Sequence, residues 1–414
     1  MFELIIIRDW LEFAVRWLHV IAGIAWIGSS FYFIALDLGL RRPSGLPAGV
    51  HGEEWQVHGG GFYHVRKYMV APAEMPAHLT WFKWESYVTW LSGFALLMIV
   101  YWAGAELYLI DRTKFYLQVW QGILISALSL SIGWLVYDRL CKSRLGENPT
   151  TLMVLLFFLL VAMAWGYDQL LTGRAALLHI GAFTATIMTA NVFMIIIPNQ
   201  KVVVADLAAG RKPDPKYGKI GKLRSTHNNY LTLPVIFLML ATHYPLAFAT
   251  EYNWLICSLV FLMGVAIRHY FNSVHARKGH PHWTWAVTAM IFVGIMWLST
   301  YGPPDEAGQS SQVLQDRQPE TEDVAARVQE IVSARCVACH SSEPVWAGMH
   351  RPPKGMILET ESQIQRFAGP IYLQAGISVA MPPANLTNMT MEERTIIANW
   401  YRRMPHALLG RTGS

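Results

Sequence analysis

Long runs of apolar residues, separated by short polar stretches, fill the first 302 residues of the chain. Eight such segments can be traced, and they lie at residues 11–36, 84–105, 115–137, 150–166, 175–198, 229–249, 252–271 and 283–301. Crossing the hydrocarbon core of a bilayer as a helix takes about 20 residues, and most of the segments reach that length. The pattern predicts an all-α domain over residues 1–302, a bundle of eight transmembrane helices.

The basic residues of the connecting loops predict how this bundle crosses the membrane. The loops after the first, third, fifth and seventh segments are rich in Lys and Arg, whereas the loop after the sixth has none. Because basic loops stay cytoplasmic, both termini are expected on the outer side. The first segment is too long for a signal peptide and lacks a small-residue cleavage site, so it is expected to remain as a membrane helix.

The composition agrees with a membrane protein, since 53% of the residues are hydrophobic and only 15% are charged. The net charge of +5 is modest and lies mostly in the odd loops, and nothing indicates nucleic acid. Cys141 and Cys257 lie far apart without metal-ligand spacing, so both are expected to be free buried thiols.

A second domain is expected after the last apolar segment. Residues 303–320 are polar and rich in Pro, Gly, Ser and Gln, which predicts a flexible linker. In residues 321–414, Cys336, Cys339 and His340 form a C-x-x-C-H run. In such a run the thiols attach covalently to a c-type haem and the His binds its iron. Zinc or thiol-redox chemistry is the alternative for the cysteines alone.

Met381 is predicted to be the second iron ligand of this haem c. It precedes two prolines, which remove backbone donors and hold the loop rigid. His/Met ligation raises the potential of a haem. An amphipathic helix is expected at residues 323–332, and a capping box at Thr390 opens another. Residues 321–414 therefore predict a small class I cytochrome c domain, although Met381 could also be an ordinary core methionine.

Three histidines lie in the outer half of the predicted bundle. His19 and His179 occupy corresponding positions in the first and fifth segments, and His243 lies near the end of the sixth. Ionisable groups inside a membrane are costly and therefore suggest function. Two facing imidazoles could bind a b-type haem, with His19 paired to His179 or His243. The alternative is that each His forms a hydrogen bond to a neighbouring helix.

A second polar group lies at the cytoplasmic ends of the segments. His227, Asn228 and Asn229 follow Arg224 at the start of the sixth segment, and Lys83 precedes the second. A planar, amide-rich, anionic ligand would need such donors and acceptors together with a cation. These residues are candidates for a substrate site, and a solvated basic surface is the alternative.

Four stretches carry a resemblance to a known family, namely WLHVIAGIAWIGSSFYF at 17–33, GGGFYHVRKYMVAPAEMP at 59–76, HNNYLTLPVIF at 227–237 and CVACH at 336–340. Together they resemble the bacterial membrane-bound urate oxidases with a fused cytochrome c domain, also called urate hydroxylases. The first segment and the start of the second also resemble haem-binding membrane proteins linked to protoporphyrinogen oxidation, which supports His19 as a haem ligand.

The resemblance implies a multi-pass enzyme of the bacterial inner membrane, with its haem c domain in the periplasm. It would oxidise urate to 5-hydroxyisourate and pass electrons through haem to a soluble cytochrome c or terminal oxidase, without making hydrogen peroxide. Urate would bind near residues 227–229, where Lys83, Arg224 or a nearby His could assist proton removal. An outer site beside haem c, using His19, His179 or His243, stays open. The sequence does not indicate an oligomeric state.

Three rival functions also remain. A quinol:cytochrome c oxidoreductase would carry the same haems and ignore urate. A non-catalytic, membrane-anchored electron carrier would need only one span, and the buried histidines and long cytoplasmic loops argue against it. A haem-biosynthetic oxidase is the third.

Overall fold

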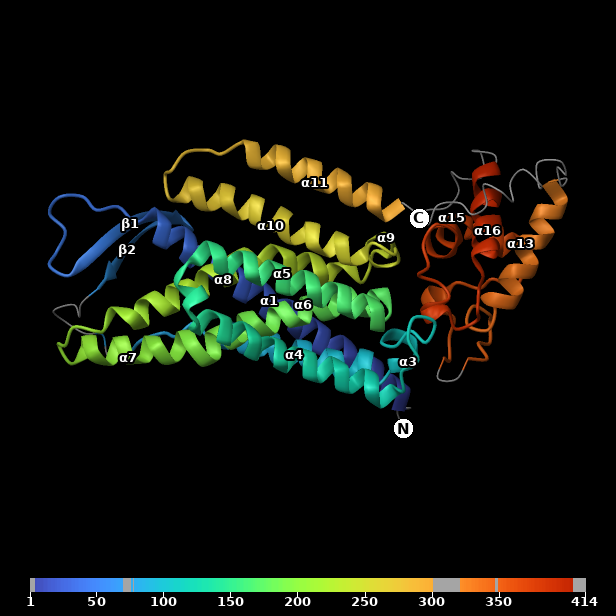
Figure 1. The fold of residues 1–414 in the computed structure, drawn as a ribbon, viewed down its shortest axis with the longest axis horizontal. Helices are drawn as coiled ribbons and strands as arrows, with labels where there is room; N and C mark the ends of the chain where they lie inside the picture. The colour runs from blue at the N-terminus through green and yellow to red at the C-terminus, as the bar shows by residue number, and fades with distance from the viewer. Residues whose placement is uncertain (1–3, 70–75, 77, 301–320, 347–348, 405–414) are drawn as a thin grey trace.

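The computed structural model describes residues 4–69, 76, 78–300, 321–346 and 349–404. It shows a long bundle of helices with a smaller helical unit, the C-terminal unit, at one end (Figure 1). The predicted linker at residues 303–320 lies outside the described residues. The elements of the bundle are α1 (Leu4–Gly39), β1 (Val50–His58), β2 (Gly61–Tyr68), α2 (Trp84–Leu96), η1 (Leu97–Trp102), α3 (Ala105–Tyr108), α4 (Val119–Lys142), η2 (Arg144–Glu147), α5 (Pro149–Leu170), α6 (Gly173–Ala190), η3 (Asn191–Ile196), α7 (Ile197–Ala208), α8 (Pro215–Ala241), α9 (Pro245–Phe248), α10 (Asn253–His275) and α11 (Trp283–Thr300).

Six helical segments among the described residues are long and apolar enough to cross a membrane. They are the segments at 6–39, 119–142, 149–170, 173–208, 253–275 and 283–300. The second predicted span corresponds to α2, which continues into the π-helical turn η1, and the sixth corresponds to the second half of α8. Neither meets the same criterion of length and composition, so the count of eight spans stays a prediction.

The outward faces of α1 and α11 are apolar. Trp10, Trp17 and Ile24 of α1 are each more than 60% exposed, and so are Met290 and Val293 of α11. An apolar helix surface of this extent is unfavourable in water and favourable in lipid. The described helices are therefore compatible with a multi-pass membrane protein.

The core of the bundle lies between α4, α5, α6 and α8, where side chains such as Leu156 and Leu238 are fully buried. Small residues allow these helices to approach closely. A Cβ on Gly133 of α4 would lie 1.8 Å from the ring of Phe183 on α6. Close contact at small residues is a common way for membrane helices to pack, and it fixes α4 against α6.

Residues 50–68, which lie between the first two predicted spans, form a β-hairpin, and this corrects the prediction of an all-α domain over residues 1–302. β1 and β2 pair antiparallel, and Gly59 and Gly60 form the two-residue turn with φ of 59° and 79°. Such a turn needs positive φ at both positions, which glycine adopts without strain. The glycines therefore close a hairpin within the connection between the first and second predicted spans.

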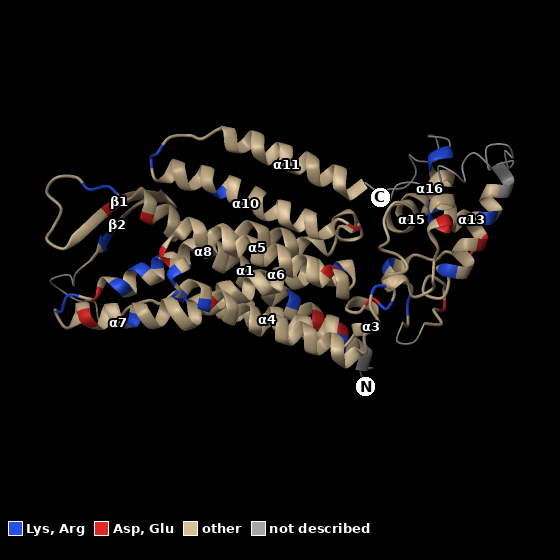
Figure 2. Cartoon of the chain, in the orientation of Figure 1, with Lys and Arg blue, Asp and Glu red and all other residues tan. Residues whose placement is uncertain are grey.

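The stretch between the fifth and sixth predicted spans is mostly helical. α7 continues α6 through the π-helical turn η3, and α8 begins at Pro215 with Asp214 as its N-cap. Figure 2 shows the basic residues of α7 and the start of α8 at the end of the bundle away from the C-terminal unit. The expected long loop is therefore a short turn between two helices that extend beyond the apolar part of the bundle.

The C-terminal unit consists of α13 (Thr321–Arg335), η4 (Pro353–Gly355), α14 (Glu361–Arg366), α15 (Ala368–Ile371), η5 (Tyr372–Gly376), η6 (Pro383–Asn385) and α16 (Met391–Arg403). The amphipathic helix is confirmed in α13, whose Val328 and Val332 are buried against α16. The capping box is also confirmed, because the Thr390 side chain accepts from the Glu393 N–H and the Glu393 carboxylate accepts from the Thr390 N–H.

The C-terminal unit packs on one end of the bundle (Figure 1). Here η6 lies against α3 and η5 lies against α9. The Val379 N–H donates to the Ala249 carbonyl oxygen at 3.3 Å. The loop that contains Met381 therefore lies close to the bundle.

Candidate functional site

His19 is held by α2 through one of its two ring nitrogens. Nδ1 lies 2.9 Å from the Thr89 carbonyl oxygen and 3.1 Å from Ser92 Oγ. Because a carbonyl only accepts, Nδ1 carries the proton and Nε2 keeps its lone pair. Gly93 makes room for the ring, since a Cβ there would lie 2.8 Å from His19 Cε1. A hydrogen bond from one ring nitrogen to a carbonyl oxygen typically orients a histidine that binds a metal through the other nitrogen.

His179 is fully buried on α6, and both of its ring nitrogens have protein partners. Nε2 lies 2.7 Å from Ser126 Oγ, and Nδ1 lies 2.7 Å from the Ala175 carbonyl oxygen. Tyr101 and Tyr167 contact the edges of the ring. Binding iron through Nε2 would break the bond to Ser126, so this arrangement favours the interhelical hydrogen-bond alternative for His179.

His243 lies in the turn after α8, and its side chain is exposed. Its electrostatic neighbours are Arg174 and Arg16 of the bundle and Lys354 of the C-terminal unit. No hydrogen bond of the described residues joins any two of the three outer histidines. The structure therefore places His243 at the contact between the bundle and the C-terminal unit, which we call the joint.

The inner candidates Arg224, His227 and Asn228 belong to a buried hydrogen-bond network. They share one face of α8, since they are three and four residues apart. His227 Nδ1 lies 2.7 Å from the Tyr137 hydroxyl of α4. Asn191 of η3 connects the network, because its amide nitrogen lies 3.1 Å from the Tyr137 hydroxyl and 2.9 Å from Asn228 Oδ1.

The charge in this network comes from an arginine with only 2% of its surface exposed. Arg224 donates to Asp138 Oδ1 at 2.6 Å and to Asn191 Oδ1 at 3.1 Å. Lys142 donates to the other Asp138 oxygen at 2.6 Å. The guanidinium also lies over the Tyr137 ring, 4.9 Å from its centroid. One carboxylate thus faces two cations, which leaves the site with a net positive charge.

Asn229 faces α10 and has a separate set of partners. Its amide nitrogen donates to Asn272 Oδ1 at 3.2 Å, and Arg268 donates to the same oxygen at 3.0 Å. The Arg268 guanidinium lies 4.3 Å from the ring centroid of Phe31 on α1. The structure therefore divides the predicted triplet of residues 227–229 between two helix contacts.

Three buried polar atoms of this region have no hydrogen-bond partner in the described chain. They are His227 Nε2, Asn229 Oδ1 and Arg268 Nε. Unsatisfied buried polar groups are costly and often mark a functional site. Arg268 Nε is a donor, Asn229 Oδ1 is an acceptor, and His227 Nε2 takes either role according to its tautomer, which suits a ligand rich in N–H and C=O groups.

Lys83 does not join this network. It lies at the N-cap of α2, with its ammonium 5.5 Å from the ring centroid of Trp84. None of the hydrogen bonds or ion pairs of the described residues connects Lys83 with His227 or Arg224. The structure thus separates Lys83 from the other predicted catalytic residues.

Several partners of the candidate residues were absent from the sequence-based candidates: Tyr137, Asp138 and Asn191 of the network, and Arg268 and Asn272 beside Asn229. A signal for them exists in the sequence, because each is a polar residue in or beside an apolar segment, where polar groups are costly. Their common location depends on helix packing, so sequence alone did not connect them.

The C-x-x-C-H run lies just after α13, and its residues fit the attachment of a haem. Cys336 and Cys339 are free thiols, and both are partly exposed. Burial raises the pKa of the Cys336 thiol to about 12. His340 Nδ1 lies 3.0 Å from the Met356 carbonyl oxygen, which leaves Nε2 for iron. Cys336 and Met381 pack against the same apolar core.

Arg394 supports the loop that contains Met381. It is 3% exposed, and it donates to the carbonyl oxygens of Met381 at 2.7 Å and Ala375 at 3.0 Å. Burial lowers the pKa of the Arg394 guanidinium to about 10. None of the ion pairs of the described residues includes Arg394, and backbone carbonyl dipoles stabilise its charge. Arg394 therefore fixes the backbone at the predicted ligand.

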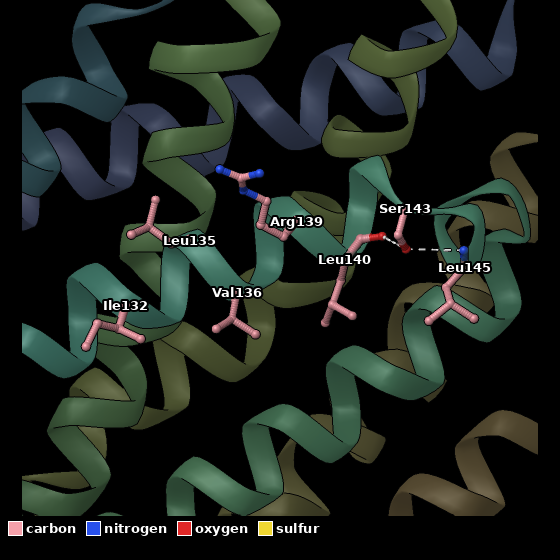
Figure 3. A pocket seen from close by; sticks show the side chains of 7 residues that line it. All are labelled: Ile132, Leu135, Val136, Arg139, Leu140, Ser143 and Leu145. Atoms are coloured by element: carbon pink, nitrogen blue, oxygen red, sulfur yellow. Dashed lines mark hydrogen bonds between the residues drawn. The ribbon is translucent and has the colours of Figure 1, made fainter.

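A surface pocket on α4 and η2 is lined by Ile132, Leu135, Val136, Arg139, Leu140, Ser143 and Leu145 (Figure 3). Ile132 and Leu135 are more than half exposed on the outside of the bundle. None of the candidate residues lines this pocket, and its apolar walls suit a lipid chain better than a polar substrate. We assign it no catalytic role.

Long apolar helices around a buried polar network are compatible with a multi-pass membrane protein of the helical class. Residues 5–299 match the family model described as Urate oxidase N-terminal. The match covers more than half of the chain, so this protein belongs to that family. Membership supports a urate-related oxidoreductase. No curated protein and no solved structure matches the chain.

Proposed function

We propose that this protein oxidises urate to 5-hydroxyisourate in the bacterial inner membrane and passes the electrons through haem to cytochrome c. The observation that carries the proposal is the family match over residues 5–299. The C-x-x-C-H run adds an electron acceptor in the same chain. The proposal places the C-terminal unit on the periplasmic side, since the basic end of the bundle lies opposite to it.

The reaction balances without oxygen. Water adds a hydroxyl group to C5 of urate, and two protons and two electrons leave. A haem accepts one electron at a time, so two successive transfers complete the oxidation. The buried network of α4, η3 and α8 supports the proton transfer, because His227 Nε2 is a buried, titratable ring nitrogen with no partner in the described chain. The net positive charge around Arg224 would attract the urate anion.

Two haems fit the residues of this route. Cys336, Cys339 and His340 would hold haem c, with Met381 as the second ligand. In the bundle His19 is the best candidate for a b-type haem, because its Nε2 is the free nitrogen. His243 suits the role of its partner better than His179, whose Nε2 is already bound by Ser126.

The direct test combines a pyridine haemochrome spectrum of the purified protein with the addition of urate. We expect both b-type and c-type signals, and reduction of both haems by urate under anaerobic conditions. The variant His19→Ala should lose the b-type signal and keep the c-type signal. If urate reduces neither haem and quinol reduces both, the quinol:cytochrome c oxidoreductase replaces this proposal. If neither urate nor quinol reduces the haems, the non-catalytic electron carrier replaces this proposal.

Replacing Arg394 by Leu is expected to weaken Met381 ligation and leave haem c covalently attached. The change removes the donors to the Met381 and Ala375 carbonyls, and hydrogen bonds from charged groups contribute about 1.5–3 kcal/mol each. The methionine-to-iron charge-transfer absorption should fall and the haem c potential should drop. Arg403→Leu is the control, since Arg403 is exposed on the same helix. An unchanged absorption band in Arg394→Leu would contradict the assigned role.

A further inference from the structure

The joint between the bundle and the C-terminal unit gathers positive charge. Arg16 of α1 and Arg174 of α6 come from the bundle, and Lys354 of η4 comes from the C-terminal unit. All three are electrostatic neighbours of His243. Like charges on both sides of a contact repel each other, so this contact is unfavourable unless an anion lies between them.

The described chain supplies a carboxylate to only one of these cations. Arg16 pairs with Glu12, one turn earlier on α1. No ion pair of the described residues includes Arg174 or Lys354. The Arg174 Nε atom is buried without a hydrogen-bond partner, and its guanidinium lies 5.4 Å from the ring centroid of Tyr108. The guanidinium also interacts with the Tyr101 side chain, so Nε is the one buried donor of this side chain that is still available to an anionic ligand.

The backbone holds Lys354 in a strained position at this joint. Its φ is 54°, in the left-handed region that a lysine rarely adopts. Pro352 and Pro353 precede it and Gly355 follows it, so the turn is rigid. Strain of this kind persists only where the surrounding structure imposes it, and it is often found at binding sites.

The position of His19 indicates the chemistry of the missing anion. Arg16 and His19 are three residues apart and therefore share one face of α1. A porphyrin carries two propionate carboxylates, and a haem on His19 would have Arg16 as a cation on the same helix face. We propose that Arg16, Arg174 and Lys354 bind propionate carboxylates of a haem at this joint.

Two haems could supply these carboxylates. One is the b-type haem on His19, and the other is haem c, because Lys354 belongs to the unit that contains His340. Either source places cations beside a haem, which stabilises the reduced form and raises its potential. The inference rests on the proposed function for the presence of haem, and it adds residues that would hold the two redox centres together.

The test compares Arg174→Gln and Lys354→Gln in the full-length holoprotein. The measurements are the ratio of b-type to c-type haem and the two midpoint potentials. If haem b is the source, Arg174→Gln should release haem b about tenfold more readily, as expected for the loss of one charge-assisted hydrogen bond. It should also lower the potential of haem b alone. If haem c is the source, both variants should lower the potential of haem c alone.

Two further variants keep the test decisive. Arg174→Lys retains the charge and should restore most of the potential, which a purely structural role of Arg174 would not predict. Arg112→Gln is the matched control at the same end of the bundle, because Arg112 is 47% exposed and pairs with Glu106. It should change neither haem.

Unchanged haem content and potentials in Arg174→Gln and Lys354→Gln would overturn the inference. A rise in the KM for urate with unchanged haems would also overturn it, in favour of an outer substrate site. Failure of the proposed function looks different, because the unmodified protein would then lack haem b or fail to be reduced by urate.

Discussion

Replacing His227 by Gln is expected to lower the rate of urate-dependent cytochrome c reduction by at least about 100-fold, the usual contribution of a general base. Gln keeps a side chain able to bond to Tyr137 and removes the ring nitrogen that has no partner. The haem spectra and the thermal unfolding temperature should stay close to those of the unmodified protein. Steady-state kinetics with urate and a soluble cytochrome c measure the effect.

Two controls separate proton transfer at His227 from a structural role. Tyr137→Phe removes the hydroxyl that lies 2.7 Å from His227 Nδ1, so it should shift the pH profile of kcat with little change in haem content. His280→Gln changes an exposed histidine of the loop between α10 and α11 and should have no effect. A rate for His227→Gln within about threefold of the original would exclude His227 as the base.

The helices were predictable because their signal is local. Each apolar segment predicted from the sequence overlaps one or more helices of the structure. The capping box at Thr390 also forms as expected. The hairpin at residues 50–68 was missed, although its Gly59-Gly60 turn is a recognised hairpin signal. The polar residues of the two strands give no strong strand signal of their own, so the turn alone did not identify the hairpin.

The inner network was predictable only in part, because its partners come from distant segments. His227 and Tyr137 are 90 residues apart, and Arg224 and Asp138 are 86 apart. Helices that are apolar on most faces give little indication of which faces meet, so their sequence pattern does not fix these contacts. The sequence identified Arg224, His227 and Asn228, and helix packing supplied Asp138 and Asn191.

The outer histidines show the same limit. Sequence placed His19 and His179 at equivalent positions, yet their hydrogen bonds differ. His19 keeps one ring nitrogen free, whereas His179 has partners on both. The difference depends on Ser126, which comes from α4 and has no counterpart beside His19 Nε2 among the hydrogen bonds of the described chain. Equivalent residues can therefore have a ligand role in one helix and a packing role in another.

The charge balance of the inner network leads to a second large effect, on stability. Asp138→Asn is expected to lower the free energy of unfolding by about 3–5 kcal/mol, because it leaves the Arg224 guanidinium buried without a carboxylate. Chemical unfolding in detergent micelles, followed by tryptophan fluorescence, measures the loss. The double variant Asp138→Leu with Arg224→Leu should recover part of it, since removing both charges leaves no unpaired ion.

Lys142→Gln is the matched control for this prediction, because it changes the other cation that pairs with Asp138. The Lys142 side chain is 60% exposed, so its ion pair is solvated and should contribute no more than about 1 kcal/mol. Equal losses in Asp138→Asn and Lys142→Gln would contradict the argument, since they would mean that burial of Arg224 does not determine the cost. A large loss confined to Asp138→Asn, with recovery in the double variant, would show that Asp138 compensates the buried charge of Arg224 beside His227.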